Sequence, residues 1–266
     1  MHNYVICTSQ RSGKTWLART LSGLGAGQAE EFITELHKQN PALLDDWDEH
    51  DVLEFFRDCL SRQQGACAGV SVQWNEFSWM AIHAKITPTQ LFSILLDALG
   101  PQNRIILLKR DDVISQAISQ YLLSRTGYGH SFQPAPRNED IAYDGRAIAN
   151  FVGFALDAYE NWDRLLSSAP NILEIKYEAL SVNPIFNIRN VMDFIGNKKF
   201  IEEDTIICCL DKTKKLDNKL NRKLYHQFID DKLYSDVRAR AYDYVQSPSP
   251  FRDALEYSEA ALIKSK

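Results

Sequence analysis

The stretch that decides the fold is Ser9-Gln10-Arg11-Ser12-Gly13-Lys14-Thr15-Trp16. It follows the apolar run Tyr4-Val5-Ile6-Cys7 and leads into helix-forming residues up to Leu21. The apolar run predicts a buried strand, the polar stretch predicts a tight turn, and the residues after it predict a helix. This order of elements aims backbone N–H groups and the positive end of a helix at one spot. The stretch therefore predicts a phosphate-binding site.

Side chains in the same stretch strengthen that prediction. Arg11 and Lys14 add two positive charges, and Ser12 and Thr15 add hydroxyl donors. P-loop kinases and nucleotide hydrolases have a Gly, four residues, then Gly-Lys-Ser/Thr. Here the second half of that pattern is present, but Thr8 stands where the first glycine belongs. The alternative is the 5′-phosphosulfate loop of sulfotransferases, which has a basic residue, Ser-Gly, and a Thr-Trp or Thr-Leu helix start.

The composition and net charge of the chain limit which kinds of molecule it is expected to bind. The chain has 266 residues, of which 45% are hydrophobic and 24% charged, and its net charge is −5. A negative chain is not a general polyanion binder, so we expect no nucleic-acid partner and assign phosphate affinity to local basic clusters.

Targeting and metal-binding signals are missing from the sequence. The N-terminus enters a strand without a signal region, and no apolar run approaches the ~20 residues that span a bilayer. Five cysteines lack zinc or CxxC spacing, and six histidines are scattered. We therefore expect a cytoplasmic protein with no integral membrane segment and no metal.

Strand-like and helix-like segments alternate along the chain. Strands are predicted at 4–7, 66–74, 104–108 and 171–175, and helices at 15–21, within 34–64 with a break at Pro41, and at 88–99, 112–124, 146–168 and 187–195. A loop is expected from Gly127 to Arg137. This order predicts an α/β fold, a P-loop-like three-layer sandwich with a central parallel sheet flanked by helices. We expect a single domain over 1–266, with a core at 1–197 and a helical C-terminal part at 198–266.

A second segment repeats the strand–turn–helix order. Arg110 follows the strand at 104–108, and Ser115 and Ser119 lie in the next helix. Arg110 alone could simply pair with Asp112. Because ligands sit at the carboxyl ends of parallel strands, however, this segment and the first loop should meet at one edge of the sheet. Together they describe a nucleotide that carries phosphates at two places.

At this point the chain resembles a known group, the PAPS-dependent sulfotransferases, and most closely the bacterial trehalose 2-sulfotransferase-like (Stf0) family. The matching strings are Ser9-Gln10-Arg11-Ser12-Gly13-x-Thr15, Glu31-Phe32, Trp74-Asn75, Arg110-x-Asp112-Val113-x-Ser115-Gln116-Ala117-x-Ser119 and Tyr177-Glu178-x-Leu180. They occur in the same order as in the family, between about Tyr4 and Gly196.

The resemblance implies a cofactor, 3′-phosphoadenosine 5′-phosphosulfate (PAPS), which is released as adenosine 3′,5′-bisphosphate (PAP). It implies that Glu31, Lys14 and Arg11 are catalytic, with Glu31 as general base and Glu30 as the near alternative. The implied cofactor-binding residues are Gln10, Arg11, Ser12, Gly13, Lys14, Thr15, Trp16, Arg110, Ser115 and Ser119. The sulfuryl group would go to a hydroxyl of a carbohydrate, glycolipid or small natural product.

The chain departs from the family pattern at one charged position. A strand lysine that precedes the Trp-Asn pair in the family is replaced by Ser71, and Lys14 stands where many relatives have Ser or Thr. Lys14 is therefore a candidate for restoring the lost charge from the other side of the site. Two other functions stay open from sequence: an ATP–Mg-dependent P-loop kinase or nucleotide hydrolase, and a PAPS- or PAP-binding protein without turnover. A homodimer also stays open.

Overall fold

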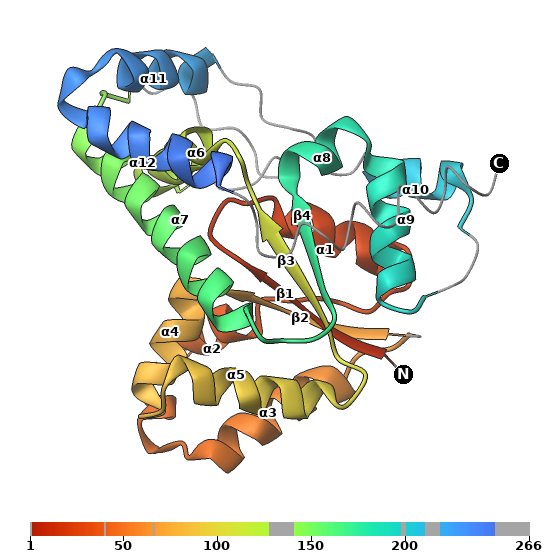
Figure 1. Ribbon diagram of the computed structural model, residues 1–266. Coiled ribbons are helices and arrows are strands. Elements are labelled where there is room, and N and C mark those ends of the chain that lie inside the picture. Colours follow the sequence, from red (N-terminus) through yellow and green to blue (C-terminus); the bar gives the residue numbers. More distant parts are fainter. Residues whose placement is uncertain are drawn as a thin grey trace.

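One parallel sheet lies at the centre of the protein. Figure 1 presents the computed structural model, which describes residues 2–39, 41–65, 67–127, 141–197, 201–210 and 219–247. The strands are β1 (His2–Thr8), β2 (Cys67–Gln73), β3 (Arg104–Lys109) and β4 (Ile172–Lys176), in the order β2-β1-β3-β4. Every neighbouring pair is parallel, and Val5 of β1 lies opposite both Val70 and Ile105.

Helices cover both faces of this sheet (Figure 1). They are α1 (Lys14–Gly23), α2 (Phe32–Gln39), the 3₁₀ helix η1 (Pro41–Asp46), α3 (Glu49–Ser61), α4 (Trp74–His83), α5 (Pro88–Leu99), α6 (Val113–Thr126), α7 (Gly145–Leu166), α8 (Tyr177–Val182), α9 (Pro184–Phe194), α10 (Glu203–Leu210), α11 (Lys219–Asp230), the 3₁₀ helix η2 (Lys232–Tyr234) and α12 (Ser235–Gln246). The predicted three-layer α/β sandwich is confirmed. Helices α4 and α8 were not predicted from the sequence.

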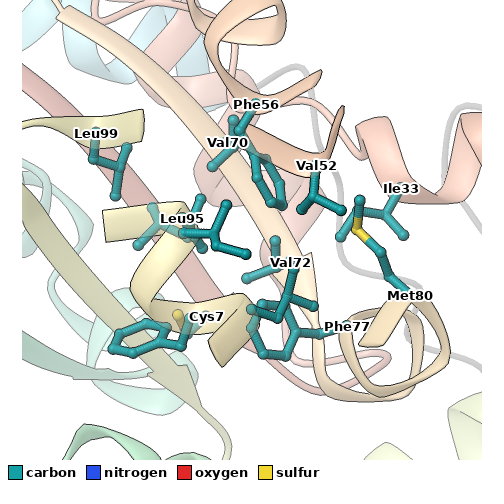
Figure 2. Packing of buried hydrophobic residues seen from close by; sticks show 14 of the residues in the cluster. Cys7, Ile33, Val52, Phe56, Val70, Val72, Phe77, Met80, Leu95 and Leu99 are labelled. Atoms are coloured by element: carbon teal, nitrogen blue, oxygen red, sulfur yellow. The ribbon is translucent and has the colours of Figure 1, made fainter. Parts of the chain in front are cut away.

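Alternate strand residues supply the two layers of the core. Val5 and Cys7 of β1 face one cluster, which is completed by side chains of α3, α4 and α5. Figure 2 shows this cluster, in which Val70 and Val72 of β2 lie together with Phe56. Their neighbours in the strands face the other side, where α1, α9 and α10 complete a second cluster. The period of two in β1 and β3 therefore buries both faces of the sheet, as parallel sheets require.

A third cluster joins the C-terminal helices to the core. Residues of α11 and α12 pack on α6 and α7, with Phe228 and Ala241 among the buried side chains. The described portions of 198–266 are thus largely helical. The predicted loop from Gly127 to Arg137 falls, beyond Gly127 itself, outside the described residues. Of the helices described, none has the length and apolar character that crossing a bilayer demands.

Sheet order fixes where a ligand can bind. The chain leaves β1 towards β2 on one side and later returns to β3 on the other side of β1. In such a sheet the crevice outside the carboxyl ends of the two diverging strands is open to a ligand. The loop after Thr8 and the loop after Lys109 both begin at that crevice.

Candidate active site

The first loop is fastened to the sheet by Thr8, at the position where P-loop proteins have glycine. Its hydroxyl donates to the Leu108 carbonyl of β3 at 2.7 Å and contacts the Ser12 hydroxyl. Its own carbonyl accepts from the buried Trp162 indole N–H at 2.8 Å. A glycine could make neither side-chain contact. The departure from the P-loop pattern at Thr8 therefore ties β1, β3 and the loop together.

Gly13 allows the loop to turn into α1. Its φ is +95°, and it is the N-terminal cap residue of α1 without any side chain capping the first turn. The N–H groups of that first turn have no partner within the helix, so they can bind an anion. A Cβ atom at Gly13 would lie 2.4 Å from Cδ2 of Tyr177. Position 13 thus requires glycine both for its backbone conformation and for its contact with the Tyr177 ring.

We expect Gly13→Ala to destabilise the protein more than Gly25→Ala. Both positions have positive φ, +95° and +76°, but a Cβ atom at Gly25 meets nothing within 4 Å. The shared backbone strain costs about 1–2 kcal/mol. Overpacking against Tyr177 adds roughly 1–3 kcal/mol at position 13 only. Urea unfolding of both variants measures the difference, and equal free energies of unfolding would show that the Tyr177 ring yields freely.

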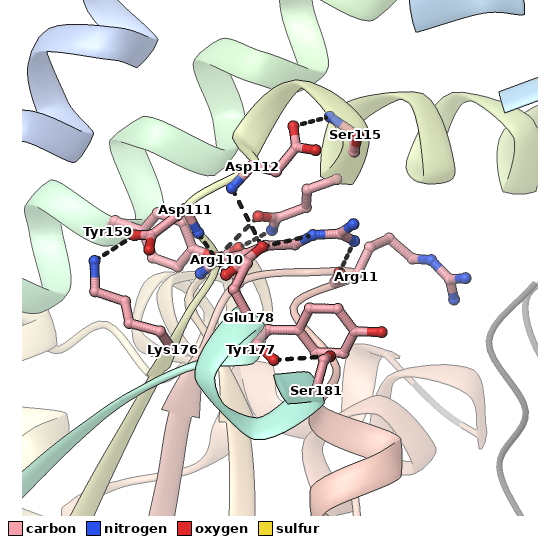
Figure 3. A network of polar contacts seen from close by, with 12 residues as sticks. Arg11, Arg110, Asp111, Asp112, Ser115, Tyr159, Lys176, Tyr177, Glu178 and Ser181 are labelled. Carbon is pink, nitrogen blue, oxygen red and sulfur yellow. Dashed lines mark hydrogen bonds and ion pairs between the residues drawn. The ribbon is translucent and has the colours of Figure 1, made fainter. Parts of the chain in front are cut away.

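The second loop presents Arg110 in a fixed orientation (Figure 3). Its Nε atom is 3.5 Å from Glu178 Oε1, and its guanidinium lies over the Tyr177 ring at 4.9 Å from the centroid. Its Nη1 atom donates to the Arg11 carbonyl at 3.5 Å. The sequence left open an ion pair with Asp112. Instead the Asp112 carboxylate caps α6 by accepting from the Ser115 backbone N–H at 2.9 Å.

Arg11 brings the two predicted phosphate segments into contact. Its φ is +60°, and its Nε atom donates to the Ser119 hydroxyl at 3.0 Å. Burial lowers the pKa of Arg11, and the nearby charge of Arg110 lowers it further. Two guanidinium groups and a hydroxyl therefore gather between the loops, which favours a multiply charged anion. Of the two candidate serines, Ser119 contacts Arg11, and Ser115 lies one turn earlier in α6.

Two buried residues that the sequence analysis did not select link the loops. The Gln116 amide nitrogen is 2.5 Å from both the Ser9 hydroxyl and the Gln10 carbonyl. The Tyr159 hydroxyl donates to Gln116 Oε1 at 2.9 Å and accepts from the Arg110 backbone N–H at 3.0 Å. Burial raises the pKa of Tyr159 to about 12, so this hydroxyl stays protonated at neutral pH. The only signal in the sequence was Gln116 within the Ser-Gln-Ala string.

Helix α12 packs against Tyr159, one of the two residues that link the loops. The Tyr244 ring stacks on the Tyr159 ring at 6.0 Å between centroids, and its hydroxyl donates to Asp163 at 2.9 Å. Asp163 in turn pairs with the buried Lys109 at 2.5 Å, and Glu174 lies 3.2 Å from the same ammonium. The ammonium of Lys109, the last residue of β3, therefore lies between two carboxylates that balance its charge. Helix α12 packs behind the second loop through Tyr244.

Lys14 and Glu31 form an ion pair at the start of α1. The Lys14 Nζ atom lies 2.9 Å from Glu31 Oε1, and the Lys14 side chain is only 7% exposed against 33% for Glu31. Burial lowers the pKa of Lys14, while the charges of Glu31 and Glu76 act in the opposite direction. The pair thus brings together two of the three residues predicted to be catalytic.

The adjacent Glu30 is held by its backbone and is otherwise exposed. Its carbonyl accepts from both the backbone N–H and the hydroxyl of Ser71, each at 3.1 Å. Its side chain lies on the surface. Glu31 directly precedes α2, which begins at Phe32. Of the two neighbouring glutamates, Glu31 is the one that reaches Lys14.

A second carboxyl group, from Glu76 on α4, lies beside this pair. Its Oε1 atom lies 2.5 Å from Thr34 Oγ1 and accepts from Gln73 Nε2 at 3.0 Å. Sequence reasoning missed Glu76 together with its helix. Across the described ranges, no three His, Cys, Asp or Glu side chains gather in the way that a bound metal ion requires.

Comparison with known proteins identifies the class. The family model described as Stf0 sulphotransferase matches residues 3–223, which is well over half of the chain. The chain therefore belongs to the Stf0 sulfotransferase family, and the protein is a sulfotransferase.

Two curated relatives are trehalose 2-sulfotransferases. That of Mycolicibacterium smegmatis is 24% identical over 222 residues, covering 73% of this chain and 81% of the relative. That of Mycobacterium tuberculosis is 23% identical over 223 residues, covering 73% and 84%. Solved structures with similarity include mouse sulfotransferase SULT7A1 complexed with PAP (14% identity, TM-score 0.43, covering 80% of this chain and 64% of that one). Another is the sulfotransferase domain of the Synechococcus PCC 7002 olefin synthase (14%, 0.44, 91% and 92%).

Proposed function

We propose that this sulfotransferase moves a sulfuryl group from PAPS to an acceptor hydroxyl, with Glu31 as the general base. The observation that carries the proposal is the 2.9 Å contact between Glu31 and Lys14 at the start of α1. It supports a base and a cation side by side at the loop where the 5′-phosphosulfate would lie. Bound PAPS supplies the sulfuryl group and a good leaving group, PAP.

The residues present fit such a cofactor. Arg11, Arg110 and Ser119 form a basic group between the loops that suits the 3′-phosphate. The uncapped first turn of α1 and the Ser12 and Thr15 hydroxyls suit the 5′-phosphosulfate. We assign Gln10, Gly13 and Trp16 to the same loop site, and Ser115 to the second segment.

The proposed roles follow from where charge changes during transfer. Sulfuryl transfer, like phosphoryl transfer, has a loose transition state in which negative charge builds on the leaving oxygen. Lys14 and the N–H groups of α1 would stabilise that charge as it develops. Glu31 would accept the proton of the acceptor hydroxyl, since its carboxylate is partly exposed and lies beside Lys14.

A carbohydrate hydroxyl is the acceptor we favour. Both curated relatives named above act on trehalose by their names, and their similarity covers about three quarters of this chain. A glycolipid or small natural product would present the same chemical group to Glu31. An ATP–Mg-dependent kinase is disfavoured, because β3 ends in Lys109, paired with Asp163 and Glu174, where Mg²⁺ would need a free carboxylate.

Thermal stabilisation tests the cofactor. PAP should raise the melting temperature far more than ATP with Mg²⁺, because a ligand stabilises the state that binds it. At a concentration of about 100 Kd the gain is roughly 2.7 kcal/mol. Equal or greater stabilisation by ATP–Mg²⁺ would overturn the assignment to PAPS.

The Arg110→Ala variant tests the 3′-phosphate group. We expect it to weaken PAP binding by roughly 10–100-fold, since a charged hydrogen bond to phosphate contributes about 1.5–3 kcal/mol. Adenosine 5′-phosphate lacks the 3′-phosphate, so its affinity should hardly change. Isothermal titration calorimetry with both ligands gives the comparison. Equal losses for the two ligands would remove Arg110 from the 3′-phosphate site.

A further inference from the structure

Glu76 is a partly buried carboxyl group to which the proposed reaction gives no role. Its Oε1 atom is 2.5 Å from the Thr34 hydroxyl oxygen and 3.0 Å from the Gln73 amide nitrogen. The same two atoms lie 3.2 and 3.3 Å from Glu31 Oε2. One hydroxyl and one amide therefore join the carboxyl groups of Glu31 and Glu76, which come from different segments.

Counting hydrogens shows which protonation states satisfy these contacts. The Gln73 amide has two N–H groups and can donate to both carboxyls, but the Thr34 hydroxyl has a single hydrogen. Ionised carboxylates only accept. If Glu31 and Glu76 were both ionised, one of the two Thr34 contacts would bring oxygen lone pairs together. A proton on Glu76 removes this conflict, because Glu76 then donates to Thr34 and Thr34 donates to Glu31.

Burial of Glu76 points the same way. Burial is the largest influence and raises the pKa of Glu76, and the charge of Glu31 adds to that rise, whereas the charge of Lys14 and the contacts with Thr34 and Gln73 oppose it. With both carboxyls ionised, the buried Lys14 would face two negative charges. Of the other charged groups on elements that pack on α4, Lys38 of α2 pairs with Glu35, and the charges of Glu31 and Glu76 also raise its pKa. Asp45 of η1 pairs with His83 at the far end of α4, Asp163 of α7 pairs with Lys109, and α5 carries Asp97.

We propose that Glu76 carries a proton in the resting enzyme and, through Thr34, holds Glu31 as the single carboxylate that faces Lys14. Glu76 is thus a positioning residue for the proposed base, and this role in catalysis rests on the proposed function. Lys14 then faces one negative charge and keeps its attraction for a polyanionic donor. Ionisation of Glu76 would add a second negative charge and oppose binding of that donor.

The pH dependence of stability tests the proton on Glu76 without any substrate. Where the pKa of a carboxyl is higher in the folded state than its ordinary value of 4.5, the folded state holds a proton that the unfolded state releases. Stability then falls as pH rises from about 4.5 through the folded-state pKa. Glu76→Gln should remove a dependence of up to about tenfold per pH unit in the unfolding constant. The glutamine amide can still donate to Thr34.

Matched variants distinguish the contribution of Glu31 and Glu76 to the pH dependence of stability from that of the other titrating groups. Glu30→Gln, an exposed change one residue from Glu31, should keep the wild-type pH dependence. Glu31→Gln should shift the fall in stability to lower pH, because it removes the neighbouring negative charge from Glu76 and leaves Lys14 to act on Glu76 alone. Equal pH dependence in wild type and Glu76→Gln would overturn the proposal. If Glu76→Gln does not fold, a protonated-carboxyl C=O infrared band in the wild type that persists at the pH of the activity assay, where an ordinary glutamate is ionised, would support it, and its absence would overturn it.

The pH dependence of PAP affinity tests whether the proton on Glu76 affects donor binding. As pH rises through the range over which Glu76 loses its proton, the wild-type Kd for PAP should rise by roughly three- to tenfold relative to that of Glu76→Gln, for which ionisation of the phosphate itself is the same. Glu76→Gln should show no such rise, and retention of it in that variant would overturn the link to donor binding. The stability measurement uses the free enzyme, so it stands or fails independently of whether PAPS is the donor.

Discussion

Glu31→Gln is expected to lower turnover by ~10²–10⁴-fold while the fold and the affinity for PAP are kept. The glutamine side chain has nearly the same shape and can still accept from Thr34 and Gln73, which both contact Glu31 Oε2. It cannot take a proton from the acceptor hydroxyl at neutral pH. The loss should therefore fall on kcat, and steady-state kinetics with a sugar acceptor, or slow PAPS hydrolysis as a provisional assay, measures it.

Glu30→Gln is the matched control for this change. Glu30 is attached to β2 through its carbonyl, which the substitution leaves intact, and its side chain is exposed. We expect near-neutral kinetics. The reverse ranking of the two variants would move the base to Glu30, and two near-neutral variants would mean that another group takes the proton.

Lys14→Met is expected to lower kcat by at least ~10²-fold with a much smaller loss of PAP affinity, of roughly three- to tenfold at most. Methionine fills much of the buried volume of the lysine stem but removes the charge that we propose stabilises the leaving oxygen. PAP has already lost the sulfuryl group, so under the proposed function its binding should depend mainly on Arg11, Arg110 and the first turn of α1. A variant that loses PAP affinity but keeps kcat would make Lys14 a binding residue alone.

A second-site change tests whether Lys14 replaces the strand lysine of the family. Ser71 and Gln73 lie on the same face of β2, because side chains alternate along a strand, and Gln73 reaches Glu31. A lysine at position 71 therefore starts on the side of the sheet edge where Glu31 lies. Lys14→Met combined with Ser71→Lys should recover about tenfold of the lost activity if charge alone is needed. No recovery would count against the replacement.

The sequence predicted the elements that have clear boundaries. β1, the Gly13 turn and α1 follow from an apolar run, a glycine and a helix-forming segment, and β3 is a run of consecutive apolar residues. Helix α4 was missed because its apolar residues follow β2 directly, with neither glycine nor proline between them. Glu76 was missed with it, since a residue cannot be assigned to a site while its helix is unknown.

Contacts between segments that are distant in the sequence could not be predicted either. The sequence predicted that the two phosphate segments meet at one sheet edge. It did not predict that Arg11 reaches Ser119 across 108 residues, or that Tyr159 binds Gln116 and Arg110. Such contacts depend on how helices cross the sheet, which no local pattern encodes. Local patterns therefore gave the candidate residues, and packing gave the partners that orient them.

The stacking of Tyr244 on Tyr159 has a consequence for the order in which the enzyme matures. Helix α12 is the last described element to leave the ribosome, whereas β1 and its loop are among the first. A nascent chain that ends before α12 already contains all four strands, but its Tyr159 lacks the ring that stacks on it, and its Asp163 lacks the hydroxyl that donates to it. Nucleotide affinity should consequently appear late in synthesis, after the sheet is complete.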